Sequence, residues 1–211
     1  HPGQARAILR NVRVVGGNAA YGGGVYVARL TAPIFENSII ENSRASESGG
    51  GLYADNSSPI LNNVIVRNNN AKAGGGVYLS QSDAQINGST IQGNTATGTA
   101  RFLEVAGFNL TLGRGGGGGV YLDESKGGIT NSTLRNNSAK AGGAIFADNS
   151  PSSVAGSLLE GNRATADSTV IPIIVLANTA GGGGAIYAQR SDMVIEYNRI
   201  VSNTSVGPGG G

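Results

Sequence analysis

The chain has 211 residues, of which 36 are glycine, 39% are apolar and only 13% are charged. This length suffices for one domain with a core, and the wealth of glycine beside few good helix formers excludes a helical bundle. The net charge of +2 comes without any run of lysine or arginine, so nucleic-acid binding is not expected. The chain has no cysteine, which excludes disulfides and thiolate metal sites.

A glycine-led phrase recurs along the chain in six versions. Each places two or three glycines before an aliphatic residue and an aromatic one, and successive aromatics are 27, 25, 43, 25 and 41 positions apart. The period is therefore about 25 residues, and two repeats carry an extra segment. The six versions are GGGVYV (22–27), GGGLYA (49–54), GGGVYL (74–79), GGGVYL (117–122), GGAIFA (142–147) and GGAIYA (183–188).

Two further columns of residues repeat with the same period. One is an aliphatic residue followed three positions later by asparagine: Val15…Asn18, Ile39…Asn42, Ile65…Asn68, Ile91…Asn94, Leu134…Asn137, Leu159…Asn162 and Ile200…Asn203. The other is an aliphatic residue five positions earlier: Ile34, Ile60, Ile86, Ile129, Val154 and Ile195. The asparagines tolerate left-handed backbone and have amides that can bond to their equivalents in adjacent repeats.

Each repeat contains two or three short runs with strand-like alternation and no helical moment of useful length. Strands this short bury their apolar side chains by coiling, with each repeat forming one turn that stacks on the next. Glycine before each aromatic phrase then supplies the sharp corner. We predict an all-β fold over residues 1–211, a right-handed single-stranded parallel β-helix of about seven rungs with two long insertions.

The motifs resemble those of a known family. GGAI at 142–145 and GGGGAI at 181–186, alternating with the aliphatic-x-x-Asn step, are similar to the GGA[ILV] and FxxN repeats of chlamydial-type polymorphic outer-membrane proteins. The phenylalanine of FxxN is replaced here by valine, isoleucine or leucine in every repeat. The resemblance implies a β-helical passenger that is secreted or displayed at the cell surface and is often adhesive.

Both insertions fall between the asparagine and the next glycine run, at 97–114 and 166–180. Insertions at one repeat position project from one face, and these two have bases on the order of 10 Å apart. Both are apolar, so they either pack on each other over the flank of the coil or form a patch for a partner chain, with membrane contact as a third reading. The candidate contact residues are Phe102, Leu103, Phe108, Ile171, Ile173 and Ile174.

Acidic residues two positions after the aromatic form a partial column of Asp55, Asp123 and Asp148. A stacked set of carboxylates can bind Ca²⁺ through oxygen, and Asp123, Glu124 and Asp148 are the candidate ligands. The simpler reading is turn chemistry, because Asp55 and Asp148 both lie in ADNS sequences followed by proline. Calcium is the only cofactor considered, and we assign no catalytic residue.

The sequence also leaves the role of the remaining candidate sites undecided. The column of aromatic side chains is either partly buried in the flank or exposed as a ladder on which sugars stack. Asn109 lies in a glycosylation sequon within the first insert and is the most accessible of several. The longest apolar stretch, VIPIIVLA at 170–177, is too short to span a bilayer, so we predict no membrane-spanning segment.

The sequence favours a non-enzymatic structural or adhesive segment of an extracellular or cell-surface protein or filament. We expect the chain to be a fragment of a longer one, with protein partners or self-association at the rod ends and the insert loops. The alternative is a polysaccharide-binding or lyase-like polysaccharide-degrading β-helix. A catalytic function would require a groove with clustered carboxylates, a basic residue and calcium.

Overall fold

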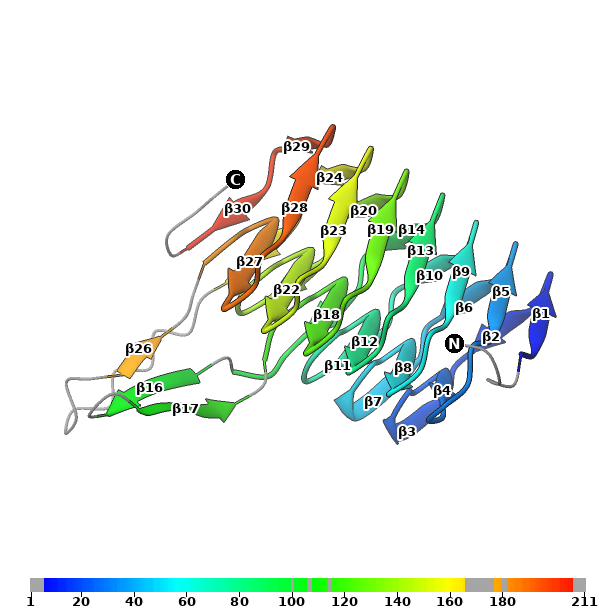
Figure 1. The fold of residues 1–211 in the computed structure, drawn as a ribbon, viewed down its shortest axis with the longest axis horizontal. Coiled ribbons are helices and arrows are strands. Elements are labelled where there is room, and N and C mark those ends of the chain that lie inside the picture. Colours follow the sequence, from blue (N-terminus) through cyan, green and yellow to red (C-terminus); the bar gives the residue numbers. More distant parts are fainter. Residues whose placement is uncertain are drawn as a thin grey trace.

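The structure, a computed structural model of the 211-residue chain, describes residues 6–99, 101–105, 108–113, 115–165, 177–179 and 182–206. Short strands coil into stacked rungs that follow one another along the molecule, and a small separate group of strands projects from one side (Figure 1). These ranges contain no helix, and therefore none of the length and apolar character that a membrane crossing requires.

Two sheets of seven strands run the length of the coil. Sheet 1 consists of β1 (Ile8–Arg10), β5 (Ile34–Glu36), β9 (Ile60–Asn62), β13 (Gln85–Asn87), β19 (Gly128–Thr130), β23 (Ser153–Ala155) and β28 (Val194–Glu196). Sheet 2 consists of β2 (Arg13–Val15), β6 (Ile39–Glu41), β10 (Ile65–Arg67), β14 (Thr90–Gln92), β20 (Thr133–Arg135), β24 (Leu158–Glu160) and β29 (Arg199–Val201).

Two more sheets complete each rung. Sheet 3 consists of β3 (Asn18–Tyr21), β7 (Arg44–Ser48), β11 (Asn70–Ala71), β15 (Thr95–Ala96), β21 (Ser138–Ala139), β25 (Arg163–Ala164) and β30 (Thr204–Ser205). Sheet 4 consists of β4 (Val25–Val27), β8 (Leu52–Asp55), β12 (Val77–Ser80), β18 (Val120–Asp123), β22 (Ile145–Asp148) and β27 (Ile186–Gln189). A rung thus has four strands where the sequence predicted two or three, because sheet 3 uses strands of as few as two residues.

All pairing within the four sheets is parallel and joins like positions of successive repeats. Tyr53 pairs with Tyr78, and Tyr78 pairs with Tyr121 although 43 positions separate them in the chain. The parallel β-helix of about seven rungs is therefore confirmed, and the predicted right hand of the coil stays a prediction.

The interior of the coil is a continuous apolar core built from one or two side chains of each short strand. Sheet 4 contributes two per strand, such as Val77 and Leu79, while sheet 3 contributes alanine. In the five inner rungs, each strand of sheets 1 and 2 contributes one large buried residue that lies between two outward neighbours: Phe35, Leu61, Ile86, Ile129 and Val154 in sheet 1 and Ile40, Val66, Ile91, Leu134 and Leu159 in sheet 2.

The register corrects the predicted columns in the early rungs by one residue. Ile39 and Ile65 align with Thr90 rather than with Ile91, whose true equivalents are Ile40 and Val66. The same shift applies to Ile34 and Ile60 in sheet 1, which align with Gln85. These strands carry two consecutive apolar residues, so alternation alone does not identify which of them points inward.

Asparagine also changes place because of this shift. Asn42 and Asn68 were expected in the stacked column, but they occupy the exposed corner position before it, with φ of 52° and 55°. The stacked position behind them is filled by Ser43 and Asn69, which are both buried.

The corner between sheets 2 and 3 holds a ladder of buried asparagines. The Oδ1 atom of Asn94 accepts hydrogen bonds from the backbone N and the Nδ2 of Asn69, both at 3.0 Å. Asn69 Nδ2 also donates to the carbonyl of Ile40 at 3.1 Å. The same geometry continues through Asn137, Asn162 and Asn203, so the ladder satisfies buried polar groups that sheet pairing leaves over at the corner.

Two other corners carry serine ladders that the sequence analysis missed. Between sheets 4 and 1, the backbone N–H of one serine donates to the hydroxyl of the next along Ser57, Ser82, Ser125, Ser150 and Ser191. Between sheets 1 and 2, the hydroxyls of Ser89, Ser132 and Ser157 accept in the same way. The sequence did contain a signal for the first of these ladders. In five rungs a serine lies four residues after the aromatic residue of the glycine-led repeat.

The corner between sheets 3 and 4 is formed by the glycine phrase. Gly74 has a φ of +58°, which is left-handed backbone that glycine adopts without strain. At Gly75 a Cβ would lie 2.4 Å from the carbonyl oxygen of Thr95 in the next rung. Glycine is thus required here by conformation at the first position and by close approach at the second.

Glu41 links three rungs on the outer face of sheet 2. Although it points away from the core, it is only 1% exposed, because Arg67 and Arg13 cover it from either side. The Nε atoms of Arg67 and Arg13 each donate to the carboxylate at 2.6 Å. These hydrogen bonds hold the pKa of Glu41 below its usual value, against burial, which raises it.

This arrangement predicts a pH-dependent contribution to stability. A carboxyl group with a lowered pKa in the folded state stabilises the fold above its unfolded pKa and loses that contribution as the pH falls. We expect Glu41→Gln to lower the free energy of unfolding at neutral pH, and the deficit to shrink as the pH falls below about 4.5. Urea unfolding across that range measures it. Glu160→Gln, an exposed position in the same column, is the control, and a deficit that does not change with pH would contradict the assignment.

Candidate functional site

The outer face of sheet 4 carries a continuous stack of aromatic rings. Their side chains alternate with the inward residues of the same strands. Successive ring centroids are between 4.7 and 5.5 Å apart and the planes differ by only 11–23°, which is the offset-stacked arrangement that aromatic pairs favour. The stack runs through Tyr26, Tyr53, Tyr78, Tyr121, Phe146 and Tyr187.

Small residues from the corner between sheets 3 and 4 cover the middle of this stack. Ala73 and Ala141 pack against the rings, and a Cβ on Gly116 would lie 2.5 Å from the Cδ2 of Phe146. Tyr78 and Tyr121 are therefore buried, while Tyr26 at the end of the stack is exposed. Of the two readings of the aromatic column, partial burial is confirmed.

Burial also sets the acid–base properties of the stack. It raises the pKa of Tyr53 and of Tyr187, which lie toward the two ends. The pKa of Tyr26 is raised first by burial and second by the neighbouring Asp55 carboxylate. These tyrosines thus keep their protons and act as hydroxyl donors or acceptors at neutral pH.

The predicted acidic column lies at the carboxyl ends of the sheet 4 strands, in register with Ser80 and Gln189. Each aspartate binds a side chain from a neighbouring rung. Asp55 accepts from Arg29 at 2.9 Å, Asp123 from the Tyr78 hydroxyl at 2.8 Å, and Asp148 from Arg190 at 2.7 Å. The column ties adjacent rungs together through these contacts.

The structure brings two of the three candidate calcium ligands onto neighbouring strands. Asp123 and Asp148 are paired positions of β18 and β22. The carboxylate of Glu124 accepts a hydrogen bond from Gln81 Nε2 at 2.9 Å, one rung earlier. Within the described ranges there is no group of three or more histidine, cysteine, aspartate or glutamate residues arranged to hold a metal ion. Calcium binding at these residues stays a prediction.

The two inserts meet in a three-stranded sheet outside the coil (Figure 1). Strand β16 (Arg101–Val105) pairs antiparallel with β17 (Phe108–Gly113) of its own insert and with β26 (Ala177–Thr179) of the other. In the second pairing Leu103 lies opposite Ala177 and Arg101 opposite Thr179. The two inserts are thus joined to each other by backbone pairing, while the predicted cover over the flank of the coil stays a prediction.

The candidate contact residues divide between the two inserts. Phe102 and Leu103 lie in β16, and Phe108 begins β17. Ile171, Ile173 and Ile174 lie outside the described residues. Asn109, the candidate glycosylation site, pairs with Glu104 in the same hairpin. The contact role and the glycan remain predictions.

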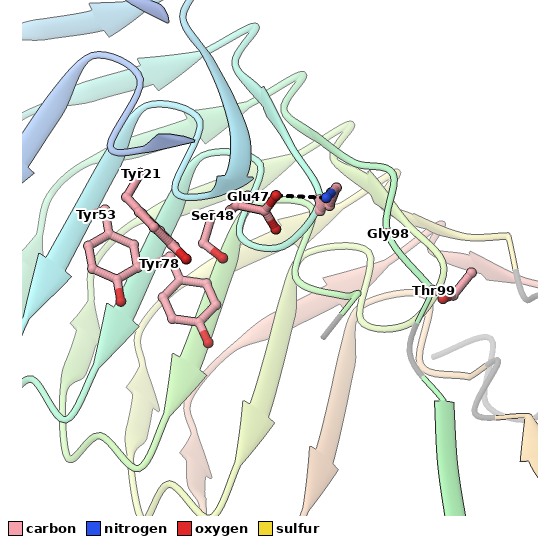
Figure 2. A pocket seen from close by; sticks show the side chains of 8 residues that line it. Tyr21, Glu47, Ser48, Tyr53, Tyr78, Gly98 and Thr99 are labelled. Carbon is pink, nitrogen blue, oxygen red and sulfur yellow. Dashed lines mark hydrogen bonds and ion pairs between the residues drawn. The ribbon is translucent and has the colours of Figure 1, made fainter. Parts of the chain in front are cut away.

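A pocket of about 520 Å³ opens beside Tyr53 and Tyr78 of the aromatic stack, where the first insert leaves the coil at Gly98 and Thr99. Figure 2 shows its lining, which combines tyrosine rings with a salt bridge between Glu47 and Lys72. The lining residues are Tyr21, Glu47, Ser48, Tyr53, Lys72, Tyr78, Gly98 and Thr99.

The sequence analysis did not identify this pocket. Its signal is an irregularity, because Tyr21 immediately precedes the first glycine triplet, where the aligned positions in the next rungs are Ser48, Ala73 and Gly116. The small residues at this position cover the aromatic stack, so a large ring at Tyr21 indicates that the stack is covered differently in the first rung.

A comparison with protein families matches residues 131–148 to the Chlamydia polymorphic membrane protein (Chlamydia_PMP) repeat. The matched segment runs from the corner before β20 to the end of β22 and contains both the Leu134…Asn137 step and GGAI at 142–145. This supports the resemblance that the motifs indicated and a coarse association with surface or outer-membrane proteins. Comparisons with curated proteins and with solved structures each found no significant match.

Proposed function

We propose that this chain is a non-enzymatic, extracellular structural segment of a surface protein, and that it adheres to protein partners through the sheet formed by its inserts. The observation that carries the proposal is the pairing of β16 with β26, since it joins two separate interruptions of the repeat into one element outside the coil. An element of this kind is free to vary without disturbing the rungs, as binding loops on rigid scaffolds do.

The chemistry of the coil itself favours a scaffold. Asparagine and serine at three corners hydrogen-bond to their equivalents one rung away. Asp55 and Asp148 are bound by arginines of adjacent rungs. Side chains committed to joining rungs in this way stabilise the rod rather than converge on a substrate.

The location rests on the repeat match, which in coarse terms supports a cell surface or outer membrane. Extracellular exposure, adhesion and assembly into a filament are the finer parts of the proposal. Self-association through the ends of the rod also remains a prediction.

Excision of the inserts tests the proposal. The first insert leaves and re-enters the coil at one place, since a Cβ on Gly115 would lie 2.0 Å from the carbonyl oxygen of Gly98. Replacing residues 100–114 and 166–181 with short glycine linkers should therefore retain the coil. We expect circular dichroism and the midpoint of urea unfolding to change little, and adhesion of protein-coated beads to cultured eukaryotic cells to fall about tenfold or more.

The matched control keeps both inserts at full length but scrambles their sequences. We expect it to behave like the excised protein if the insert surface makes the contact. Undiminished adhesion by a folded, insert-free coil would refute the proposal.

A further inference from the structure

The pocket at the foot of the first insert has the chemistry of a carbohydrate site. Its volume of about 520 Å³ falls within the roughly 300–1,000 Å³ typical of small-ligand sites and accommodates one or two sugar rings. Three tyrosines line one side, with Ser48 and Thr99 among the polar groups (Figure 2). A wall of aromatic carbon beside hydroxyl groups suits a ligand that presents apolar C–H faces and polar hydroxyl edges.

Tyr21 is the ring available for stacking. Both faces of Tyr53 are occupied, because Tyr26 and Tyr78 stack on it at centroid distances of 5.5 and 5.2 Å. Tyr21 instead meets Tyr53 at a tilt of 58° and keeps 47% of its surface exposed. A planar apolar surface that remains open at the mouth of a pocket is where a sugar ring would lie.

The charged groups favour a neutral ligand. Lys72 Nζ lies 2.8 Å from the Oε1 of Glu47, so the two charges offset each other, and the side chains remain 57% and 44% exposed. An ammonium group has three N–H donors, of which this ion pair uses one. Lys72 can thus donate to a ligand hydroxyl while Glu47 accepts from another, as bidentate recognition of neighbouring sugar hydroxyls requires. An acidic sugar would gain no net attraction.

We propose that this pocket binds a neutral carbohydrate, with one sugar ring stacked on Tyr21 and its hydroxyls bonded by Lys72 and Glu47. The site is distinct from the insert sheet and does not depend on it for its chemistry. It adds glycan recognition to a segment whose proposed contacts are with protein.

Binding to an array of oligosaccharides tests the site. The array should carry neutral galactose-, mannose- and N-acetylglucosamine-terminated glycans together with sialylated and sulfated counterparts, and the best neutral glycan is then titrated calorimetrically. We expect Tyr21→Ala to weaken that binding about tenfold and Lys72→Ala to weaken it several-fold. Tyr197→Ala, which removes an 88% exposed tyrosine in the last described rung, should leave affinity unchanged.

Three outcomes would overturn the proposal. They are the absence of binding to any neutral glycan, binding that survives both Tyr21→Ala and Lys72→Ala, and a preference for the sialylated or sulfated counterparts. Since the coil without residues 100–114 keeps Tyr21, Lys72 and Thr99, it should retain glycan binding even where it loses adhesion to cells. Failure of the two proposals is thereby distinguished.

Discussion

Replacing Asn69 with alanine will destabilise the coil by roughly 3–5 kcal/mol, because it leaves several buried polar groups without their partners. The side-chain oxygen of Asn69 accepts the backbone N–H of Ser43 at 2.9 Å, and its amide donates to the carbonyl of Ile40 and to Asn94. Alanine supplies neither group. The N–H of Ser43 lies at the corner after β6, where sheet pairing offers no substitute, and each unsatisfied buried group costs about 1–3 kcal/mol. Urea unfolding followed by circular dichroism measures the loss.

Asn68→Gly is the matched control for this prediction. Asn68 is exposed and has a φ of 55°, and glycine already occupies the equivalent corner position in the next rung, at Gly93. We expect a change within about 0.5 kcal/mol. Comparing Asn69→Ala with Asn68→Gly distinguishes the observed register from the predicted one, because the sequence motif placed Asn68 in the stacked ladder. If Asn68→Gly proved the more damaging change, the observed register would be wrong.

The sequence contained enough information for the architecture. A phrase repeated every 25 residues or so, with glycine before Val77 and Tyr78, has few other physical solutions, because neither a helix nor an isolated sheet buries such short apolar runs. The spacings of 43 and 41 positions also located the two insertions, since the extra residues interrupt the phrase at one place.

The repeat pattern did not determine the register of the strands in rungs where two apolar or two polar residues are adjacent. Ile39 and Ile40 are equally good strand residues, and Asn68 and Asn69 are equally good corner residues. What decides between them is the stacking of side chains on the later rungs, where single residues such as Ile91 and Asn94 fix the alignment. Alignment outward from the unambiguous rungs would have found it.

The candidate sites were harder to predict from the sequence than the fold. The acidic column was correctly aligned, but its binding by arginine was not predicted. Arg29 and Arg190 each lie three positions after the aromatic residue of their motif, and the other four motifs carry asparagine, glutamine or glutamate at that position. The pocket forms where Tyr21, Lys72 and Thr99 from three different rungs meet at one corner. Periodicity reports what rungs have in common, whereas this site arises from what distinguishes them.

Gly118→Ala will cost about 4 kcal/mol or more and can prevent folding, although alanine is a small change. Gly118 is the middle glycine of its phrase, and a Cβ there would lie 2.5 Å from the carbonyl oxygens of Gly143 and Ser138 and 2.6 Å from the backbone N of Ser138. All three obstacles are backbone atoms of the next rung, so no side chain can move aside. Relief requires separating the rungs, which breaks the parallel pairing of neighbouring strands. The measurement is the urea unfolding midpoint, or the yield of folded protein if the variant is too unstable.

Gly88→Ala is the matched comparison, because it measures the cost of conformational strain without any contact. Gly88 has a φ of +56°, and beyond its chain neighbours no heavy atom lies within 4 Å of where a Cβ would be, so alanine there meets conformational strain alone, worth roughly 1–2 kcal/mol. Gly118 has the opposite character, because its obstacle is the neighbouring backbone rather than a left-handed φ. The chain itself supports this distinction. All six phrases keep glycine at the middle position, whereas Ala144 and Ala185 replace it at the third. Equal costs at Gly118 and Gly88 would mean that the rungs approach less closely than the structure shows.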